Sequence, residues 1–236
     1  MSLRGLFVAG TDTAVGKTTV ASGLLRLAVS RGRRPIPFKP VETGCAPDPL
    51  DARRLWEAAG QPVPLAEVCP FPLELPAAPA AAAALVGLNL AVDDLAQRAF
   101  LLASRGDFLL VEGAGGLLAP YAGAETNADL AAALGLPILV VGKTALGTIN
   151  HVSLTVAELQ RRGLPLAGII LARHSPAPAP HEGSNDELIA GVTGQRPLGT
   201  LPYLTERDAA DSDVVAAALE RALPPEVLGR LLSGRP

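Results

Sequence analysis

Short apolar runs alternate with longer amphipathic stretches along most of the chain. The apolar runs are continuous, rich in β-branched or large aliphatic residues, and span residues 6–9, 36–38, 108–111, 138–141 and 166–171. Between them, apolar positions recur at helical spacing over residues 17–30, 51–59, 93–104, 126–134, 148–162 and 184–193. Continuous apolar runs are typical of strands that are buried on both faces. The alternation therefore predicts an α/β fold with a mostly parallel sheet flanked by helices on both faces.

Two segments interrupt this alternation and are expected to form long loops. They are rich in proline and alanine and lie near residues 62–80 and 174–183. Residues 75–92 carry no charge over 18 positions, the lower limit for a membrane-spanning helix. Because alanine drives insertion weakly and Pro76 and Pro79 interrupt the stretch, a surface loop that runs into a short helix is expected. Nothing marks a second domain, so residues 1–236, with a C-terminal tail over 224–236, are expected to form a single domain.

Charge and cysteine content narrow the classes of function. The chain has 236 residues and a net charge of −3, with no run of basic residues. Binding to nucleic acid or to an anionic membrane requires a clustered positive face, so neither partner is expected. Cys45 and Cys69 have neither metal-binding nor redox spacing, which is typical of a reducing compartment and predicts a cytoplasmic protein. The three scattered histidines argue against a histidine metal site and a Ser–His hydrolase.

The stretch VAGTDTAVGKTT (residues 8–19) resembles a phosphate-binding loop with one residue too many. The common pattern is G-x-x-x-x-G-K-[ST], whereas five residues separate Gly10 from Gly16 here. Gly16 would let the backbone approach an anion at the start of the following helix. Lys17 would contact the outer phosphates, and the Thr18 hydroxyl would bind Mg²⁺. The alternative is a glycine-rich turn that serves packing alone.

Polar residues also follow two other predicted strands. Glu112 ends an apolar run in FLLVEGAGG, and a buried carboxylate needs a partner. That partner is either the Mg²⁺ of a nucleotide or a lysine or arginine. Lys39 ends the second apolar run in FKPVETG, close to Thr43. Ligands collect at the carboxyl ends of parallel strands, so we expect Lys39 to face this rim instead of open solvent. Asp51 opens the next predicted helix, where an N-cap role alone would explain it.

A fourth segment, GKTALGTINHVSLT (residues 142–155), leads into a helix that is expected to begin near Thr148. The free N–H groups of that helix's first turn could hold a second anion, such as a substrate carboxylate. His151, in the same segment, suggests no chemistry of its own.

Taken in order, GTDTAVGKT, KPVETG, VEGAGGLLAP and LGTINH closely resemble the dethiobiotin synthetase family over residues 3–205. That family is P-loop NTPase-like and carries the same longer loop. The resemblance implies a ligase of biotin biosynthesis that converts 7,8-diaminopelargonate, CO₂ and ATP into dethiobiotin, ADP and phosphate. One amine takes up CO₂ as a carbamate, which attacks the γ-phosphate to give a carbamic–phosphoric anhydride. The second amine then closes the ureido ring. Mg²⁺ and a homodimer are implied as well.

The resemblance also implies roles for individual residues. Lys39 matches the active-site lysine, Lys17 the loop lysine, and Thr13 the threonine that faces the reacting groups. The implied magnesium ligands are Thr18, Asp51 and Glu112, although the loop before Asp51 is shorter than in some relatives. The implied nucleotide contacts are Ala14, Val15, Gly16, Lys17, Thr18, Thr19, Glu112, Gly113, Ala114, Gly115, Pro202, Tyr203 and Leu204. The implied substrate contacts are Thr43 and the segment Leu146, Gly147, Thr148, Ile149 and Asn150, which would hold the substrate carboxylate across the dimer interface.

The chain departs from the family in three places. Ala14 stands where some relatives carry an acidic residue, and Ala80 stands where the motif around Pro79 often carries a histidine. The segment LARHS (residues 171–175) lacks the asparagine that reads adenine in some members. Arg173 cannot replace that amide, because a guanidinium only donates. Base contacts are therefore expected from backbone groups near 172–174 and 202–204, with Asn185 either an N-cap or a substitute base reader.

Two other classes of protein share features of this sequence. A partition-type ATPase has a deviant phosphate loop and dimerises on nucleotide, but it generally carries a lysine near the start of that loop, where this chain has Gly10 and Thr11. A cobyrinate-type amide ligase needs a glutaminase domain or partner, for which the chain has no spare length. ATP turnover that depends on the diamine and bicarbonate distinguishes the expected enzyme from both.

Overall fold

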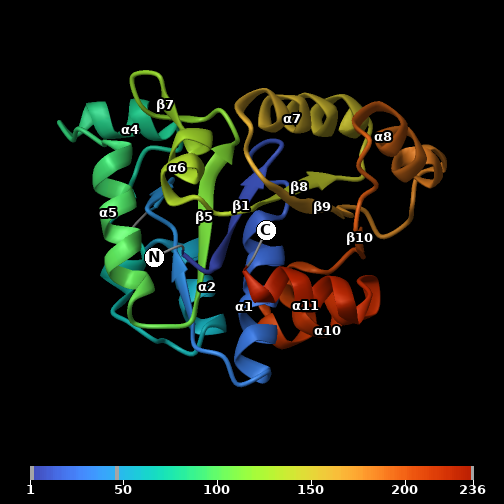
Figure 1. Ribbon diagram of the computed structural model, residues 1–236, viewed down its shortest axis with the longest axis horizontal. Helices are drawn as coiled ribbons and strands as arrows, with labels where there is room; N and C mark the ends of the chain where they lie inside the picture. Colours follow the sequence, from blue (N-terminus) through green and yellow to red (C-terminus); the bar gives the residue numbers. More distant parts are fainter. Residues whose placement is uncertain (1–2, 46–47, 235–236) are drawn as a thin grey trace.

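The computed structural model describes residues 3–45 and 48–234 and contains a six-stranded sheet whose strands all run parallel. The strand order is β10-β9-β8-β1-β5-β2 (Figure 1). The strands are β1 (Gly5–Gly10), β2 (Pro35–Phe38), β5 (Phe108–Gly116), β8 (Ile138–Lys143), β9 (Leu166–Ala172) and β10 (Gly199–Leu201). The five predicted strands are confirmed. The edge strand β10 was not predicted, because its three residues include Gly199 and Thr200 and form no apolar run.

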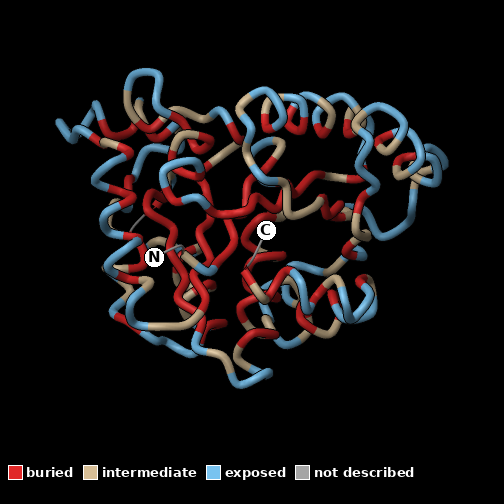
Figure 2. Tube along the Cα trace, in the orientation of Figure 1, coloured by how far each residue is buried: buried red, intermediate tan, exposed pale blue. Residues whose placement is uncertain are grey.

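Helices cover both faces of the sheet, as the pattern predicts. One face carries α1 (Lys17–Ser30), α2 (Leu50–Ala58), α10 (Ser212–Ala222) and α11 (Pro225–Ser233), and the other carries α5 (Val92–Ala103), α6 (Asn127–Leu134), α7 (Thr148–Arg162) and α8 (Asn185–Thr193) (Figure 1). Successive residues of a strand point to opposite faces. Leu6 and Val8 accordingly pack in the core beside α1, and Phe7 and Ala9 pack in the core beside α5. The strands are buried and the outer faces of the helices are exposed (Figure 2).

The six predicted helices agree with α1, α2, α5, α6, α7 and α8 to within one residue at each end. The tail expected over 224–236 is helical over most of its length. In α11, Leu228, Leu231 and Leu232 lie at helical spacing and are buried in the core beside α1. Residues 235–236 lie outside the described part of the chain.

The two expected loops contain short elements. The first holds α3 (Leu65–Val68) and β4 (Phe71–Leu73), which pairs with β3 (Val41–Thr43), and it leads into α4 (Pro79–Leu85). The second leads into a 3₁₀ turn, η1 (Pro180–Ser184). α4 has only seven residues, and none of the helices in 3–45 and 48–234 is both long and apolar enough for a membrane span. Residues 75–92 are therefore a loop with a short helix, as expected.

The segments with candidate chemistry gather at one edge of the sheet. The phosphate-type loop follows β1, Lys39 follows β2, and Glu112 lies within the long strand β5. Lys143 ends β8, and Pro202 follows β10. The parallel arrangement puts all of these carboxyl ends on the same side, where α/β proteins bind ligands.

Candidate active site

The loop between β1 and α1 has the geometry of an anion-binding turn. α1 begins at Lys17 after Gly16, whose φ of +98° lies in the left-handed region, and no side chain caps the helix. Its first N–H groups are therefore left for a ligand. Lys17 folds back over the loop and donates from Nζ to the carbonyl of Asp12 at 3.0 Å. A side chain at Gly10 would meet Lys17, because an added Cβ would lie 2.9 Å from Nζ.

The extra residue of this loop is accommodated by a second left-handed position. Ala14 has a φ of +53°, which is uncommon for a residue other than glycine. The side chain of Ala14 is exposed and lies at a cavity of about 580 Å³ with Thr13, Lys17 and Thr18. The loop is thus lengthened and still curls around one cavity.

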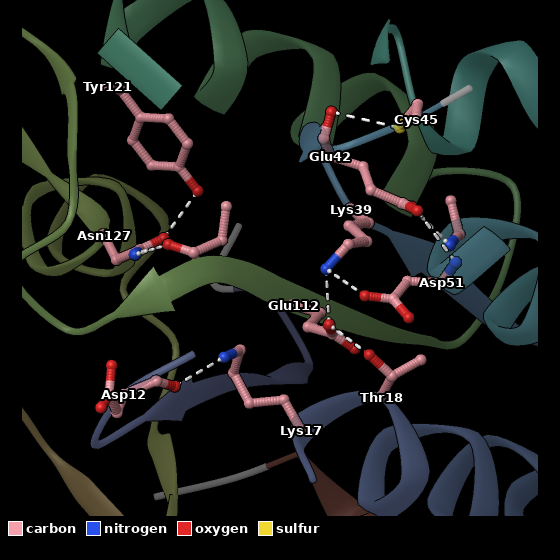
Figure 3. Close-up of polar contacts among 12 residues, drawn as sticks. Asp12, Lys17, Thr18, Lys39, Glu42, Cys45, Asp51, Glu112, Tyr121 and Asn127 are labelled. Atoms are coloured by element: carbon pink, nitrogen blue, oxygen red, sulfur yellow. Dashed lines mark hydrogen bonds and ion pairs between the residues drawn. The ribbon is translucent and has the colours of Figure 1, made fainter. Parts of the chain in front are cut away.

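Glu112 lies at the floor of this cavity and is fully buried. Its Oε1 accepts a hydrogen bond from Lys39 Nζ at 2.6 Å and another from Thr18 Oγ1 at 2.8 Å (Figure 3). Its Oε2 is buried without a hydrogen-bond partner. Lys39 Nζ also lies 3.5 Å from a carboxylate oxygen of Asp51. The structure therefore brings together two acidic side chains, one hydroxyl and one ammonium from four different segments.

The two lysines at this cavity have opposite electrostatic environments. Burial lowers the pKa of Lys17 to about 8, despite the opposing field of Glu112. Burial alone would also lower the pKa of Lys39, but the carboxylates of Glu112 and Asp51 outweigh it and raise that pKa above its ordinary value. Lys39 thus stays charged at neutral pH, whereas the charge of Lys17 is open to modulation by a bound anion.

This donor set fits a magnesium ion that is only partly enclosed by protein. The part of the chain that the structure describes contains no cluster of three or more His, Cys, Asp or Glu side chains able to hold a metal. Asp51, Glu112 and Thr18 instead offer two carboxylates and a hydroxyl beside the phosphate-type loop. Mg²⁺ usually keeps several positions for water and phosphate oxygens. Although Oε1 of Glu112 is paired with Lys39, its buried Oε2 has no hydrogen-bond partner and is left for such an ion.

Asp51 does not cap α2, in contrast to the simplest expectation for an aspartate at that place. The helix begins one residue earlier, after Pro49, and no side chain of the N-cap residue itself bonds to it. Glu42 provides the acceptor instead, by accepting from the N–H groups of Asp51 and Ala52 at 3.0 and 2.8 Å. Burial raises the pKa of Glu42, although these two bonds work against that rise. Sequence reasoning missed this residue, which stands inside the KPVETG motif.

The glycine-rich end of β5 is held by a buried amide. Asn127 Nδ2 donates to the carbonyls of Ala114 and Gly116, each at 2.7 Å, and its Oδ1 accepts from the Tyr121 hydroxyl at 2.6 Å (Figure 3). An added Cβ at Gly113 would come within 2.4 Å of Asn127 Oδ1, so this glycine serves close packing. The Asn127 amide therefore holds Ala114, which lines the phosphate cavity.

Three cavities adjoin along this edge of the sheet. The 580 Å³ phosphate cavity shares Thr13, Thr43 and Gly115 with an apolar groove of about 720 Å³. It shares Gly16, Thr19 and His174 with a smaller cavity of about 340 Å³. Of the residues with an expected nucleotide role, Val15 is buried in the core beside α1 and Ala114 in the core beside α5. The phosphate cavity, lined by several charged residues, thus has a neighbouring cavity on each side.

The apolar groove has α7 as one wall. Its helical positions His151, Leu154, Thr155 and Glu158 face residues 76–79 and 115–120 across the groove. His151, which the sequence left without a role, therefore lies beside a candidate substrate site. The expected substrate segment does not line this groove: Leu146 and Asn150 are exposed beside it.

A small cavity of about 250 Å³ lies at the start of α7. The helix begins after Gly147, at a φ of +93°, without a side-chain cap. Thr148 and Lys143 both line this cavity, and Thr148 Oγ1 is buried without a hydrogen-bond partner. These groups match what a carboxylate would require.

The far cavity brings together both segments from which base contacts are expected. Ala172, Arg173 and His174 face Pro202, Tyr203 and Leu204 across it. Arg173 pairs with Glu182 at 2.9 Å, which ties the following loop to the end of β9. Asn185 is neither an N-cap nor a base reader in this structure: Ser184 is the N-cap residue, and the buried Asn185 donates to the carbonyl of Thr144 at 2.9 Å.

Comparisons with known proteins show which sequences and folds this chain resembles. A family model described as an AAA domain matches residues 4–211. The chain is 47% identical over 222 residues to the ATP-dependent dethiobiotin synthetase BioD of Anaeromyxobacter dehalogenans strain 2CP-C, covering 92% of this chain and 100% of that protein. It is 34% identical to the protein of the same name from Bacillus cereus strain G9842, covering 92% of this chain and 90% of that protein.

Similar solved structures include a ParA family ATPase from Chlorobium tepidum TLS, with a TM-score of 0.53 and 14% identity over 98% of this chain and 96% of that one. The MinC:MinD cell division protein complex of Aquifex aeolicus gives a TM-score of 0.53 and 13% identity over 91% and 86%. At such low identity the similarity shows a shared P-loop NTPase-like fold and nothing more about function, so the partition-type alternative is not favoured. With its nearly full-length similarity to proteins of one name, the chain belongs to the ATP-dependent dethiobiotin synthetase family.

Proposed function

We propose that this protein closes the ureido ring of dethiobiotin from 7,8-diaminopelargonate and CO₂, with hydrolysis of ATP to ADP and phosphate. The observation that carries the proposal is the junction between the phosphate cavity and the apolar groove at Thr13, Thr43 and Gly115. A nucleotide whose outer phosphate ends at this junction would meet a second substrate whose hydrocarbon chain fills the groove. Membership of the dethiobiotin synthetase family supplies the identity of that substrate.

The chemistry needs positive charge where anions meet. One amine of the diamine adds to CO₂ and gives a carbamate. A carbamate oxygen attacks the γ-phosphorus of ATP, and ADP leaves. The second amine attacks the carbonyl carbon of the resulting carbamic–phosphoric anhydride, which closes the ring and expels phosphate. Lys17 and Lys39 hold fixed ammonium groups beside the junction and stabilise the charge that builds up there. Positioning, and not covalent participation by the protein, carries the reaction.

Thr18, Asp51 and Glu112 are the residues that would hold Mg²⁺. When bound, the ion neutralises charge on the phosphate oxygens during phosphoryl transfer. The unpartnered Oε2 of Glu112 and the 3.5 Å separation of Lys39 and Asp51 support this assignment. Lys39 Nζ contacts both acidic side chains beside the cavity.

The substrate carboxylate is assigned to the first turn of α7, in a homodimer. Residues 146–150 do not line the groove of their own chain, and Leu146 and Leu154 are among the strongly exposed apolar side chains described. Two copies that meet at this face would bring the first turn of α7 from one to the open end of the groove of the other. The uncapped N–H groups and the Thr148 hydroxyl would then bind the carboxylate.

The test is product analysis with labelled bicarbonate. The protein is incubated with the diamine, ¹³C-bicarbonate and Mg·ATP, without DNA, lipid or glutamine, and the products are identified by mass spectrometry. Dethiobiotin that carries the label in the ureido carbon is expected, with one ADP formed for each ring closed. ATP turnover that ignores the diamine but responds to DNA or lipid would overturn the proposal.

A further inference from the structure

The first turn of α2 carries Asp51 into the active site but has no cap of its own. The residue before the helix is Pro49, which has no side-chain acceptor for the free N–H groups. A helix end whose N–H groups are left buried and unpaired is costly. The chain must therefore bring an acceptor from elsewhere if Asp51 is to be held in a fixed position.

Glu42 supplies that acceptor from the short strand β3. Its Oε1 accepts from the N–H of Asp51 at 3.0 Å, and its Oε2 accepts from the N–H of Ala52 at 2.8 Å. The residue is only 7% exposed, and the Cys45 thiol donates to its carbonyl. Figure 3 shows the carboxylate pointing at the backbone of the first turn of α2 and away from Lys39. A carboxylate at this end of a helix is also favoured by the helix dipole.

This contact leaves the side chain of Asp51 free for the cavity. An aspartate at a helix start ordinarily folds back to accept from its own helix, but here the backbone acceptor is already present. The Asp51 carboxylate accordingly reaches Lys39 Nζ at 3.5 Å. Both oxygens of Glu42 accept from backbone N–H groups, and the described residues include no group of three His, Cys, Asp or Glu side chains able to hold a metal. Glu42 is therefore assigned to the helix and not to the ion, although it lines the same cavity.

We propose that Glu42 is the positioning residue of the metal site: by binding the first turn of α2 it fixes Asp51 in the orientation that a divalent ion requires. The inference rests on the proposed function, because the metal role of Asp51 is part of that proposal. It assigns Glu42 an effect on metal affinity that acts through Asp51 and not through direct coordination.

The test measures metal binding separately from catalysis. Mn²⁺ serves as the probe, and its binding to the protein–ADP complex is followed by the loss of the free-ion EPR signal. Removing a group that orients a ligand typically weakens metal binding by tenfold or more, so Glu42→Ala should raise the Kd for Mn²⁺ by about tenfold. Glu42→Gln, which keeps one acceptor, should lie between Glu42→Ala and the wild type. The same order should hold for the Mg²⁺ concentration that gives half-maximal turnover.

Two comparisons separate positioning from a general loss of stability. Asp211 caps α10 by accepting from the N–H groups of Asp213 and Val214, and it lies outside the phosphate cavity. Asp211→Ala should lower Tm by about 3 °C, as expected for a lost cap, and leave the Kd for Mn²⁺ unchanged. In a double-mutant cycle, Glu42→Gln should add no further loss of Mn²⁺ affinity to Asp51→Asn, because it acts through the same side chain.

An unchanged Kd for Mn²⁺ in both Glu42 variants, or full additivity with Asp51→Asn, would overturn the inference. These outcomes are distinct from a failure of the proposed function. That failure would appear in the wild-type protein as an absence of labelled dethiobiotin, whatever the metal affinity of the variants.

Discussion

Lys39 Nζ and Glu112 Oε1 lie 2.6 Å apart, and both side chains are almost completely buried. Neither charge has ready access to water, so each depends on the other for compensation. The same Glu112 oxygen accepts from Thr18 Oγ1, at the start of α1. A single carboxylate oxygen thus joins the end of β2 to the beginning of the helix that follows the phosphate-type loop.

Lys39→Ala should therefore affect both turnover and stability. We expect kcat to fall by about a hundredfold or more while the Kd for ADP stays within a few-fold of wild type, because the ammonium stabilises charge that develops only during reaction. The variant should also lose about 3 kcal/mol of stability, since Glu112 is left as an unpaired buried charge. Steady-state kinetics, calorimetric ADP binding and urea unfolding measure the three quantities.

Mg²⁺ should restore part of the stability lost in Lys39→Ala, because the ion would replace the missing positive charge beside Glu112. The double variant with Glu112→Gln serves as the control and should be insensitive to Mg²⁺. Turnover of Lys39→Ala close to that of the wild type would remove Lys39 from the catalytic machinery.

Glu112→Gln and Asp51→Asn should each raise the Mg²⁺ concentration needed for half-maximal activity, since each removes a charged oxygen from the surroundings of the ion. The increase should be about tenfold or more. Asp48→Asn is a matched control, because Asp48 pairs with Arg53 near the start of the same helix. If Asp51→Asn and Asp48→Asn require the same Mg²⁺ concentration for half-maximal activity, Asp51 is not a magnesium ligand.

The approach of Lys39, Thr18 and Glu112 was predictable because it follows from strand ends. Three apolar runs mark buried parallel strands, and the residues that follow such strands must meet at one edge of the sheet. The helix α11 was also within reach of the pattern, since Leu228, Leu231 and Leu232 lie at helical spacing. Both features can be predicted because hydrophobic periodicity is visible in a single sequence.

The contacts of Glu42 and Asn185 were not predictable on that basis. Glu42 and its partner Asp51 in α2 lie nine positions apart in the sequence, and Asn185 and Thr144 lie forty-one apart. A polar side chain can satisfy its hydrogen bonds with many backbone groups, so residue type and spacing do not select the partner. Only the packing of the loops decides it, and that packing has no periodic signature.

Affinity for ADP should depend on pH through Lys17. In the nucleotide-free protein the pKa of Lys17 is about 8, so the ammonium loses its proton as the pH rises above that value. Bound phosphates favour the charged form and raise the pKa in the complex. Binding above pH 8 must then take up a proton, and affinity in EDTA should fall by up to about tenfold per pH unit. Calorimetry in two buffers of different ionisation enthalpy measures the proton uptake, and a constant affinity from pH 7 to 9 would contradict this assignment.

If each active site is formed by both subunits of a dimer, mixing two inactive variants should restore activity. Lys39→Ala destroys the phosphate side of a site, and Asn150→Asp places a negative charge where the substrate carboxylate is assigned. If these residues act from different subunits, mixing the two inactive variants should restore up to about a quarter of wild-type activity, because half of the dimers are hybrids with one intact site. Subunit exchange is verified by native mass spectrometry. No recovery despite proven exchange would place residues 146–150 in the site of their own chain.

Discrimination between nucleotide bases should be weak. An enzyme rejects a wrong base strongly when dedicated polar groups would be left unpaired, and the residues that line the cavity beside β10 include no asparagine or glutamine amide. The Arg173 side chain is paired with Glu182, and the amide of Asn185 is occupied by Thr144. The phosphate contacts of Lys17 and Thr18 do not depend on the base. CTP and GTP should therefore support the reaction within about a hundredfold of ATP in kcat/KM.

Asn185→Ala should leave the ratios between nucleotides unchanged, because that side chain bonds within the fold. Steady-state rates with the four nucleoside triphosphates test both statements, and a preference for ATP above about ten-thousandfold would mean that an amide or backbone pair reads the base after all.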